Sequence, residues 1–227
     1  HLYTLQSMMD FQAIPFVKLV SLVIKKRVDV QSSYPLVQLG TVCEIRIGGT
    51  PSRSNYSYFG GNNLWVSIAE MKGQIITNTK EKITDEGVKN SNVKLVPKGT
   101  TLLSFKLSIG KTAIAGVDLY TNEAIAALIP LERDENKSNY VSDQYLFQLF
   151  SSKLIDLEHV DYKAFGQSLN SNYLKNEVRI PLPPSSIQKL IVSECKKIDE
   201  EYNTSRMSID TYRQKIAEIF DRLEVVS

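Results

Sequence analysis

Few residues of this chain have the types and the spacing that acid–base or metal chemistry requires. The two histidines, His1 and His159, stand far apart, and we expect His159 to lie on the surface. Acidic residues such as Glu44, Glu70 and Glu123 are scattered, without the close spacing of a nuclease site. Metal sites and histidine-based catalysis need several such side chains together. The sequence therefore predicts no metal site, no catalytic residue and no enzyme activity in this chain.

Motifs for nucleotide and methyl-donor cofactors are incomplete. Gly110–Thr112 (Gly-Lys-Thr) resembles the end of a phosphate-binding loop, but Phe105 stands where that loop needs its first glycine. The double proline occurs in Leu182–Ser185, without the Asn or Asp before it and the aromatic residue after it that mark adenine methyltransferases. No glycine-rich dinucleotide turn follows the first predicted strand. We predict no cofactor bound by this chain.

The composition of the 227 residues is that of a soluble globular protein. Hydrophobic residues make up 42% of the chain and the formal net charge is +2, which argues against disorder and allows one domain of about 150 residues plus a further segment. Cys43 and Cys195 lack metal-ligand spacing, so we expect free thiols in a reducing cytoplasm. The apolar run 16–24 is too short to span a membrane and, unlike a signal peptide, is followed by its basic residues. The predicted location is cytoplasmic.

Three segments are predicted: a lead-in over residues 1–35, a globular domain over 36–184 and a helical segment over 185–227. Within the domain, runs 101–105 and 113–117 predict strands, and 124–130 is apolar throughout, as in a strand buried on both faces. Residues 141–155 predict a helix. Thr84 followed by two acidic residues predicts the start of a shorter helix. The domain is therefore predicted to be of the α/β class.

Residues 187–223 predict one long helix. Apolar residues recur there at alternating steps of four and three, and only Ser205 interrupts the pattern. The apolar positions are Ile191, Cys195, Ile198, Tyr202, Ile209, Tyr212, Ile216, Ile219 and Leu223. A mean step of 3.5 residues is the heptad pattern of helices that pair with another helix. Such a helix spans roughly 55 Å, so we expect much of this seam to need a partner helix. The alternative is an amphipathic helix that folds back on its own domain.

Short motifs follow one another in a fixed order along residues 36–223. They are Leu39–Gly40, Gly48–Ser52 (Gly-Gly-Thr-Pro-Ser), Trp65–Ile68, Pro97–Thr100, Leu103–Phe105 with Ile109–Lys111, Tyr120–Asn122, and Ile180–Pro184 with Gln188. Each motif alone is common. In this order, and ending in a helix that begins at a double proline, the chain resembles a target recognition domain of the specificity subunits of Type I restriction–modification enzymes.

This resemblance implies a fold of the α/β (α+β) class. It consists of a single globular target-recognition domain with a mixed, strongly curved β-sheet, followed by a long protruding C-terminal helix for coiled-coil pairing. A full specificity subunit is similar to two such halves in tandem with their helices antiparallel, and this chain matches one half. We therefore expect a half-subunit or a fragment, which forms a homodimer or pairs with a second recognition half through the C-terminal helix.

The resemblance also implies sequence-specific recognition of double-stranded DNA that directs adenine methylation and restriction. The expected partners are adenine methyltransferase (M) subunits docked on the helix and, through the complex, a restriction (R) subunit. S-adenosylmethionine, ATP and Mg are expected only on those partners. Two alternatives stay open. The chain is the C-terminal specificity region of a fused restriction–methylation enzyme, or it is a coiled-coil interaction protein without DNA binding.

Candidate DNA contacts lie on or beside the glycine-containing turns. Cations and the backbone amides of small residues bind phosphates, arginine pairs with guanine, and asparagine or glutamine pairs with adenine. For phosphates we predict Arg46, Arg53, Lys72, Lys106, Lys111 and Lys163, with Gly49, Thr50 and Ser52 beside them. For bases we predict Arg53, Ser54, Asn55, Tyr56, Tyr58, Lys106, Ser108, Gln167, Ser168 and Asn170. Trp65 and Phe105 are expected in the core.

Overall fold

The computed structural model describes residues 31–73, 75–106, 108–155, 157, 170–205 and 207–226. The apolar run 16–24 and most of the lead-in segment lie outside these residues. Among the helices of the described ranges, none has both the length and the apolar character needed to cross a bilayer.

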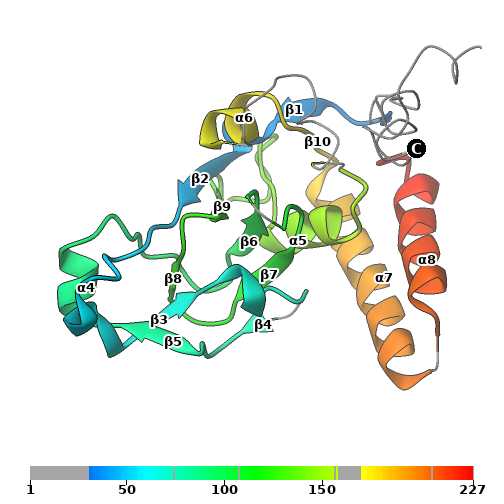
Figure 1. The fold of residues 1–227 in the computed structure, drawn as a ribbon. Helices are drawn as coiled ribbons and strands as arrows, with labels where there is room; N and C mark the ends of the chain where they lie inside the picture. The colour runs from blue at the N-terminus through cyan, green and yellow to red at the C-terminus, as the bar shows by residue number, and fades with distance from the viewer. Residues whose placement is uncertain are drawn as a thin grey trace, which may run out of the picture.

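A five-stranded sheet forms the centre of the domain (Figure 1). Its strands, in spatial order, are β2 (Cys43–Ile47), β9 (Ile125–Pro130), β6 (Thr101–Ser104), β7 (Thr112–Ala115) and β4 (Ile75–Ile76). Neighbouring strands are antiparallel except for β7 and β4, which are parallel. The prediction of a mixed sheet is therefore confirmed.

Both faces of the inner strands β6 and β9 are buried because successive side chains enter two different hydrophobic clusters. In β6, Leu103 belongs to one cluster and Leu102 to the other, and in β9 the same holds for Leu128 and Ala127. All four side chains are fully buried. This arrangement explains the unbroken apolar run 124–130, since a strand covered on both faces has no solvent side.

A three-stranded sheet extends the domain away from the C-terminal helices (Figure 1). It consists of β5 (Glu81–Ile83), β3 (Phe59–Val66) and β8 (Tyr120–Thr121), flanked by the short helices η1 (Tyr56–Tyr58) and α4 (Asp85–Lys89). The Thr84 side chain caps α4 by accepting a hydrogen bond from the Gly87 amide at 3.0 Å. The predicted start of this helix is confirmed.

The remaining elements close the domain. Strand β1 (Leu36–Gln38) pairs with β10 (Arg179–Pro181), and the other helices are α3 (Leu39–Val42), η2 (Ile68–Glu70), α5 (Asp143–Ser151) and α6 (Ser171–Asn176). Helix α5 contacts β6, β7 and β9 of the central sheet. Its Tyr145 is fully buried and donates a hydrogen bond from its hydroxyl to the Pro181 carbonyl at 2.8 Å. This contact ties helix α5 to β10, the strand that leads into the C-terminal helices.

The C-terminal segment folds as two antiparallel helices instead of one (Figure 1). Helix α7 (Ser185–Thr204) begins directly after the double proline, and its 20 residues confirm a long C-terminal helix. The chain leaves the helix at Ser205, and Ser208 caps α8 (Ile209–Arg222) by accepting a hydrogen bond from the Thr211 amide at 3.1 Å. Serine side chains favour such caps over helix interiors. The prediction of one continuous helix over 187–223 is therefore wrong.

The predicted seam is used within the chain. Ile191, Cys195, Ile216 and Ile219 are buried in the larger hydrophobic cluster, and Ile198, Tyr212 and Leu223 pack against it. The rings of Tyr202 and Tyr212 lie 4.9 Å apart, whereas Ile209 stays 45% exposed. A heptad pattern specifies which face of a helix is buried but not which chain supplies the partner. Most residues of this seam are therefore buried in, or packed against, the chain's own hydrophobic cluster, as the fold-back alternative predicted.

Both cysteines are buried free thiols, as predicted. Burial raises the pKa of Cys43 and of Cys195 from 9.0 to about 12. Between pH 9 and pH 12, the two thiols therefore keep their protons in the native state and lose them in the unfolded chain. We expect the free energy of unfolding contributed by the thiols to be complete below pH 9 and to fall as the pH rises towards 12. Urea unfolding at several alkaline pH values measures this slope, and a Cys43→Ala, Cys195→Ala variant with an equal slope would contradict the assignment.

Candidate nucleic-acid interface

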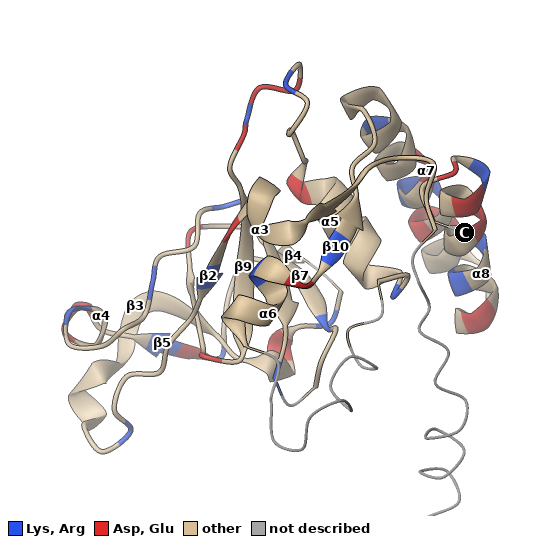
Figure 2. Ribbon diagram, turned by 90° about the horizontal axis from the view of Figure 1, so that it is seen from above, with Lys and Arg blue, Asp and Glu red and all other residues tan. Residues whose placement is uncertain are grey.

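Positive charge is concentrated in one part of the domain. Residues 46–111 contain ten lysines and arginines but four acidic residues, a net charge of +6. Residues 112–184 contain six and ten, respectively, a net charge of −4. Figure 2 shows lysines and arginines along the strands and loops around β2, β3 and β5, at the end of the molecule opposite α7 and α8. A local excess of cations is what phosphate binding requires, and the total charge of +2 conceals it.

The Gly48–Gly49 turn is fixed against the chain itself. The amides of Gly48 and Gly49 donate to the carbonyls of Ile125 (3.2 Å) and Thr121 (2.9 Å), and the Trp65 indole N–H donates to the Gly49 carbonyl at 3.0 Å. Both glycines are buried. The prediction that the Gly49 backbone approaches a phosphate therefore loses its support, because the Gly49 amide already donates to the Thr121 carbonyl. Trp65 is 2% and Phe105 1% exposed, so both core predictions are confirmed.

Replacing Gly48 by alanine is expected to destabilise the fold. A Cβ atom at this position meets the Thr121 carbonyl oxygen at 2.2 Å, and this oxygen belongs to the backbone and cannot rotate away. Overpacking of this kind costs about 1–3 kcal/mol. Thermal unfolding of Gly48→Ala measures the loss, with Ser52→Ala as the control because Ser52 is exposed in the same loop. Equal melting temperatures for the two variants would contradict this close approach.

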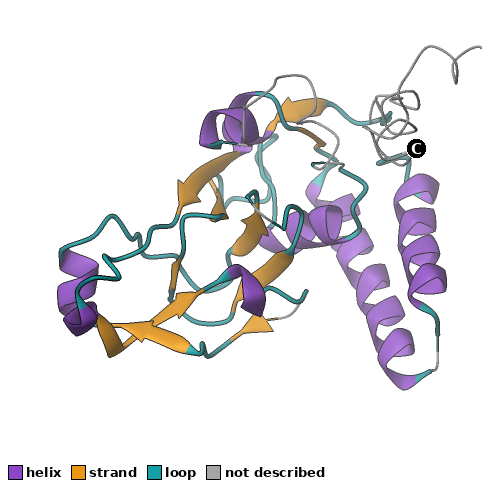
Figure 3. Cartoon of the chain, viewed as in Figure 1, coloured by secondary structure: helices purple, strands orange, loops and turns teal. Residues whose placement is uncertain are grey.

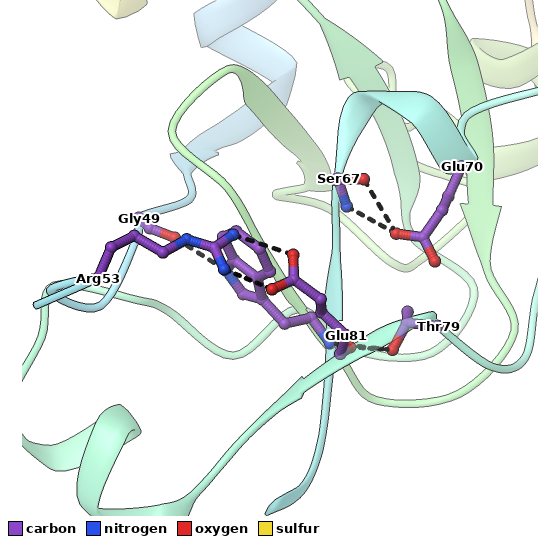
Figure 4. A network of polar contacts seen from close by, with 7 residues as sticks. Gly49, Arg53, Ser67, Glu70, Thr79 and Glu81 are labelled. Atoms are coloured by element: carbon purple, nitrogen blue, oxygen red, sulfur yellow. Dashed lines mark hydrogen bonds and ion pairs between the residues drawn. The ribbon is translucent and has the colours of Figure 1, made fainter. Parts of the chain in front are cut away.

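The loop after these glycines presents Arg53 in a fixed position (Figure 4). Its guanidinium forms a two-point ion pair with the Glu81 carboxylate and lies over the rings of Phe59 (4.5 Å) and Trp65 (5.1 Å). Hydrogen bonding between the two partners raises the pKa of Arg53 and lowers that of Glu81. Figure 4 also shows Glu70 binding the amide of Ser67 at 3.0 Å, which braces the end of β3 beside this cluster.

A second loop, residues 104–111, brings the charge of Lys106 near Glu123, which is bonded to Thr50 of the first loop. Ser104 holds the two ends of this loop together, since its carbonyl accepts from the Gly110 amide (2.9 Å) and its hydroxyl accepts from the Lys111 amide (2.9 Å). The Thr50 hydroxyl donates to Glu123, and this bond, with the charges of Lys106 and Arg53, lowers the pKa of the Glu123 carboxyl. Thr50 is thus a brace between loops, and the prediction that it contacts DNA loses its support.

The predicted cations differ in whether other residues of the chain already bind their side chains. Arg46 binds both oxygens of Glu44 and the Leu95 carbonyl, and its side chain is 25% exposed, which argues against Arg46 as a phosphate ligand. Lys72 and Lys111 are exposed, and their side chains form no hydrogen bond or ion pair with the rest of the described chain. The Lys106 ammonium lies 5.4 Å from the Phe105 ring centroid. Among the predicted cations that the structure describes, these three lysines form no ion pair with an acidic side chain of the described residues.

Several predicted base contacts have local roles. The side-chain oxygen of Asn55, Oδ1, caps η1 by accepting a hydrogen bond from the Ser57 amide at 3.1 Å. Ser52 and Ser54 share a hydrogen bond of 2.7 Å. Tyr56 is 87% exposed, whereas Tyr58 is half-buried. The exposed ring of Tyr56 is therefore the freest aromatic group of this loop.

The third predicted loop is described at one residue. Asn170 is exposed and caps α6 by accepting from the Tyr173 amide at 2.9 Å. Lys163, Gln167 and Ser168 lie outside the described residues. Ser108 is exposed, and its carbonyl accepts a hydrogen bond from the Ser104 hydroxyl. The first loop leads from β2 of the central sheet to the three-stranded sheet, whereas the second joins β6 to β7 within the central sheet (Figure 3).

Comparison with known proteins identifies the family. The model of the Type I restriction modification DNA specificity domain matches residues 32–208. This chain belongs to that family. It is 27% identical, over 84% of its length, to the MjaIX specificity subunit of Methanocaldococcus jannaschii, and 25% identical, over 73%, to the EcoR124I/EcoR124II specificity subunit of Escherichia coli. It covers 44% and 41% of those proteins, so the chain spans less than half the length of these relatives.

Solved structures share the fold of this specificity domain. The HsdS subunit from Thermoanaerobacter tengcongensis superimposes with a TM-score of 0.54 at 21% identity, over 90% of this chain and 49% of that one. A chain from a study of complex assembly and conformational transition of the type I R-M system gives 0.57 at 21% identity, over 91% and 49%. The predicted family and fold class are confirmed.

Sequence reasoning missed some residues of this specificity domain. Glu81 stands 28 residues from Arg53, and no local pattern connects them. Further exposed lysines, Lys80, Lys89, Lys94 and Lys98, lie in the same positively charged segment, and a windowed count of charge would have found them. Within the residues that the structure describes, histidine, cysteine and acidic side chains form no group of three suited to hold a metal ion.

Proposed function

We propose that this chain binds double-stranded DNA sequence-specifically as the specificity subunit, or half-subunit, of a Type I restriction–modification system. The observation that carries the proposal is the positively charged segment 46–111, which contains the two braced loops and lies within a domain of this family. Rigid loops suit base reading because a fixed side chain loses little conformational entropy on binding. The lysines around them supply sequence-independent attraction to phosphates.

In this proposal, the chemistry belongs to partner subunits. The specificity domain positions adenine methyltransferase (M) subunits on DNA and, through them, a restriction (R) subunit. The C-terminal helices are the proposed docking element, because they extend away from the charged end of the domain (Figure 1). S-adenosylmethionine, ATP and Mg are then bound by the partners, and this chain carries no catalytic residue.

We further propose that a second recognition half pairs with this one through α7 and α8. The heptad spacing continues across the helix break, and residues 205–208 (Ser-Arg-Met-Ser) contain neither proline nor glycine. A hairpin that opens at this break lets α8 of one copy replace α8 of another, with the same side-chain contacts. Two halves at a fixed distance read a split site. Sedimentation of the protein tests this pairing, and a monomer at every concentration would contradict it.

Duplex binding as a function of salt tests DNA recognition itself. Because each phosphate contact releases counterions, the affinity for random duplex should fall steeply as salt rises. A flat dependence would favour the coiled-coil interaction protein without DNA binding. A methyltransferase motif encoded upstream in the same reading frame would make the chain the specificity region of a fused enzyme.

A further inference from the structure

The guanidinium of Arg53 is held more firmly than an exposed arginine needs to be. Its Nη1 and Nη2 groups each donate to one oxygen of Glu81, with 2.9 Å between Nη2 and Oε2. Its Cζ also lies 4.5 Å from the centroid of the Phe59 ring and 5.1 Å from that of Trp65, and these two rings meet edge-on at 6.4 Å. The Arg53 side chain is nevertheless 55% exposed. A group that is both fixed and exposed is suited to bind something outside the chain.

Three of the five guanidinium hydrogens remain available. Glu81 takes one hydrogen from each Nη group, which leaves Nε–H and the second hydrogen on each Nη. These three form no hydrogen bond with any residue of the described chain. Nε–H and the neighbouring Nη2–H point in parallel along one edge of the planar group. This edge matches two adjacent acceptors, such as N7 and O6 of guanine in the major groove.

The charge around Arg53 favours a neutral partner over a phosphate. Glu81 compensates the arginine charge directly, and Glu123 is close enough to act on Arg53 as a second negative charge. The negative charges of Glu81 and Glu123 leave a phosphate with little net attraction to Arg53. The oxygen and nitrogen acceptors of a guanine edge carry no net charge, so they gain the hydrogen bonds without that repulsion. An exposed ion pair also contributes little to folding, which argues against a purely structural role.

We propose that Arg53 reads one guanine of the DNA site through Nε and Nη2, and that Glu81 is the positioning residue that aims it. This inference rests on the proposed function and deepens it by naming one base and the residue pair that selects it. Glu81 fixes the rotation of the guanidinium, and the two aromatic rings fix its plane. Lysine in place of arginine would keep the charge but lose the paired donors.

Substitution of single guanines by 7-deazaguanine tests this proposal, because the analogue lacks the N7 acceptor and retains O6. The site is first determined from the adenines methylated in cells, and each guanine of that duplex is then replaced in turn. We expect the wild-type protein to lose roughly tenfold or more in affinity at one position, as for loss of a bidentate base contact. Arg53→Ala and Arg53→Lys should bind the unmodified site more weakly, with no further loss at that position.

The variants separate reading from folding. Arg53→Lys should retain the salt dependence of binding to random duplex, and Glu81→Gln should reduce discrimination at the same guanine. Arg133→Ala is the matched control, since Arg133 is 59% exposed and paired with Asp143 at 2.7 Å, but follows the opposite end of β9 from Glu123. It should leave every position unchanged.

Two outcomes overturn the inference in distinguishable ways. If the wild type and Arg53→Ala lose equal affinity at every guanine while both prefer the site over scrambled duplex, Arg53 does not read guanine, and the proposed function stands. If the wild-type protein binds the site and scrambled duplex equally, the proposed function fails with it.

Discussion

Replacing Lys72, Lys106 and Lys111 together by alanine is expected to weaken binding to random duplex DNA on the order of a hundredfold at moderate salt. These lysines lie in the positively charged segment, and Lys72 and Lys111 are exposed without a partner among the described residues. Each lost phosphate contact makes the negative slope of log affinity against log salt shallower by about 0.9. The steepness of the slope should therefore fall by roughly 3. Fluorescence anisotropy at several salt concentrations measures both quantities.

The control for this variant carries alanine at Arg133 and Lys137. Both residues are exposed, and both lie in the segment 112–184, whose net charge is negative. This control should bind within about twofold of the wild type, since it loses no phosphate contact. Equal losses for the two variants would mean that binding follows total charge, and the charged end of the domain would not be the interface.

Replacing Phe220 by alanine should cost about 3–5 kcal/mol of unfolding free energy, the typical loss for a buried phenylalanine. Phe220 is fully buried in the larger hydrophobic cluster, and its ring stacks on Tyr145 with 6.5 Å between centroids. Helix α8 is therefore part of the core and not an appendage. Urea denaturation followed by circular dichroism measures the change.

The matched substitution on the same helix is Ile209→Ala. Ile209 is 45% exposed at the first position of α8, so its loss should cost less than about 1 kcal/mol. A similarly small effect of Phe220→Ala would contradict the packing of α8 on α5, because removal of a fully buried ring cannot be neutral.

Elements specified by local chemistry could be predicted from the sequence. Thr84 with its two following acidic residues specified the start of α4, and the apolar run 124–130 specified the buried strand β9. The family also followed from the order of short motifs, because order along the chain needs no coordinates. The predictions of α4 and β9 depended on neighbouring residues alone.

Features that depend on distant partners could not be predicted. Gly48 and Gly49 indicated a close approach, but the sequence does not tell whether backbone or ligand is approached. The seam of the C-terminal helices specified a buried face, while the partner proved to be the same chain. Arg53 was identified as a candidate, but its orientation comes from Glu81, which is brought near by the pairing of β5 with β3.

The most direct test of the central claim is a comparison of adenine methylation in cells with and without the intact gene. Two recognition halves at fixed spacing predict that deletion abolishes methylation at one split motif and leaves other motifs unchanged. An identical set of methylated adenines in both cells, with the partner methyltransferase expressed, would contradict the claim that this chain selects the DNA sequence.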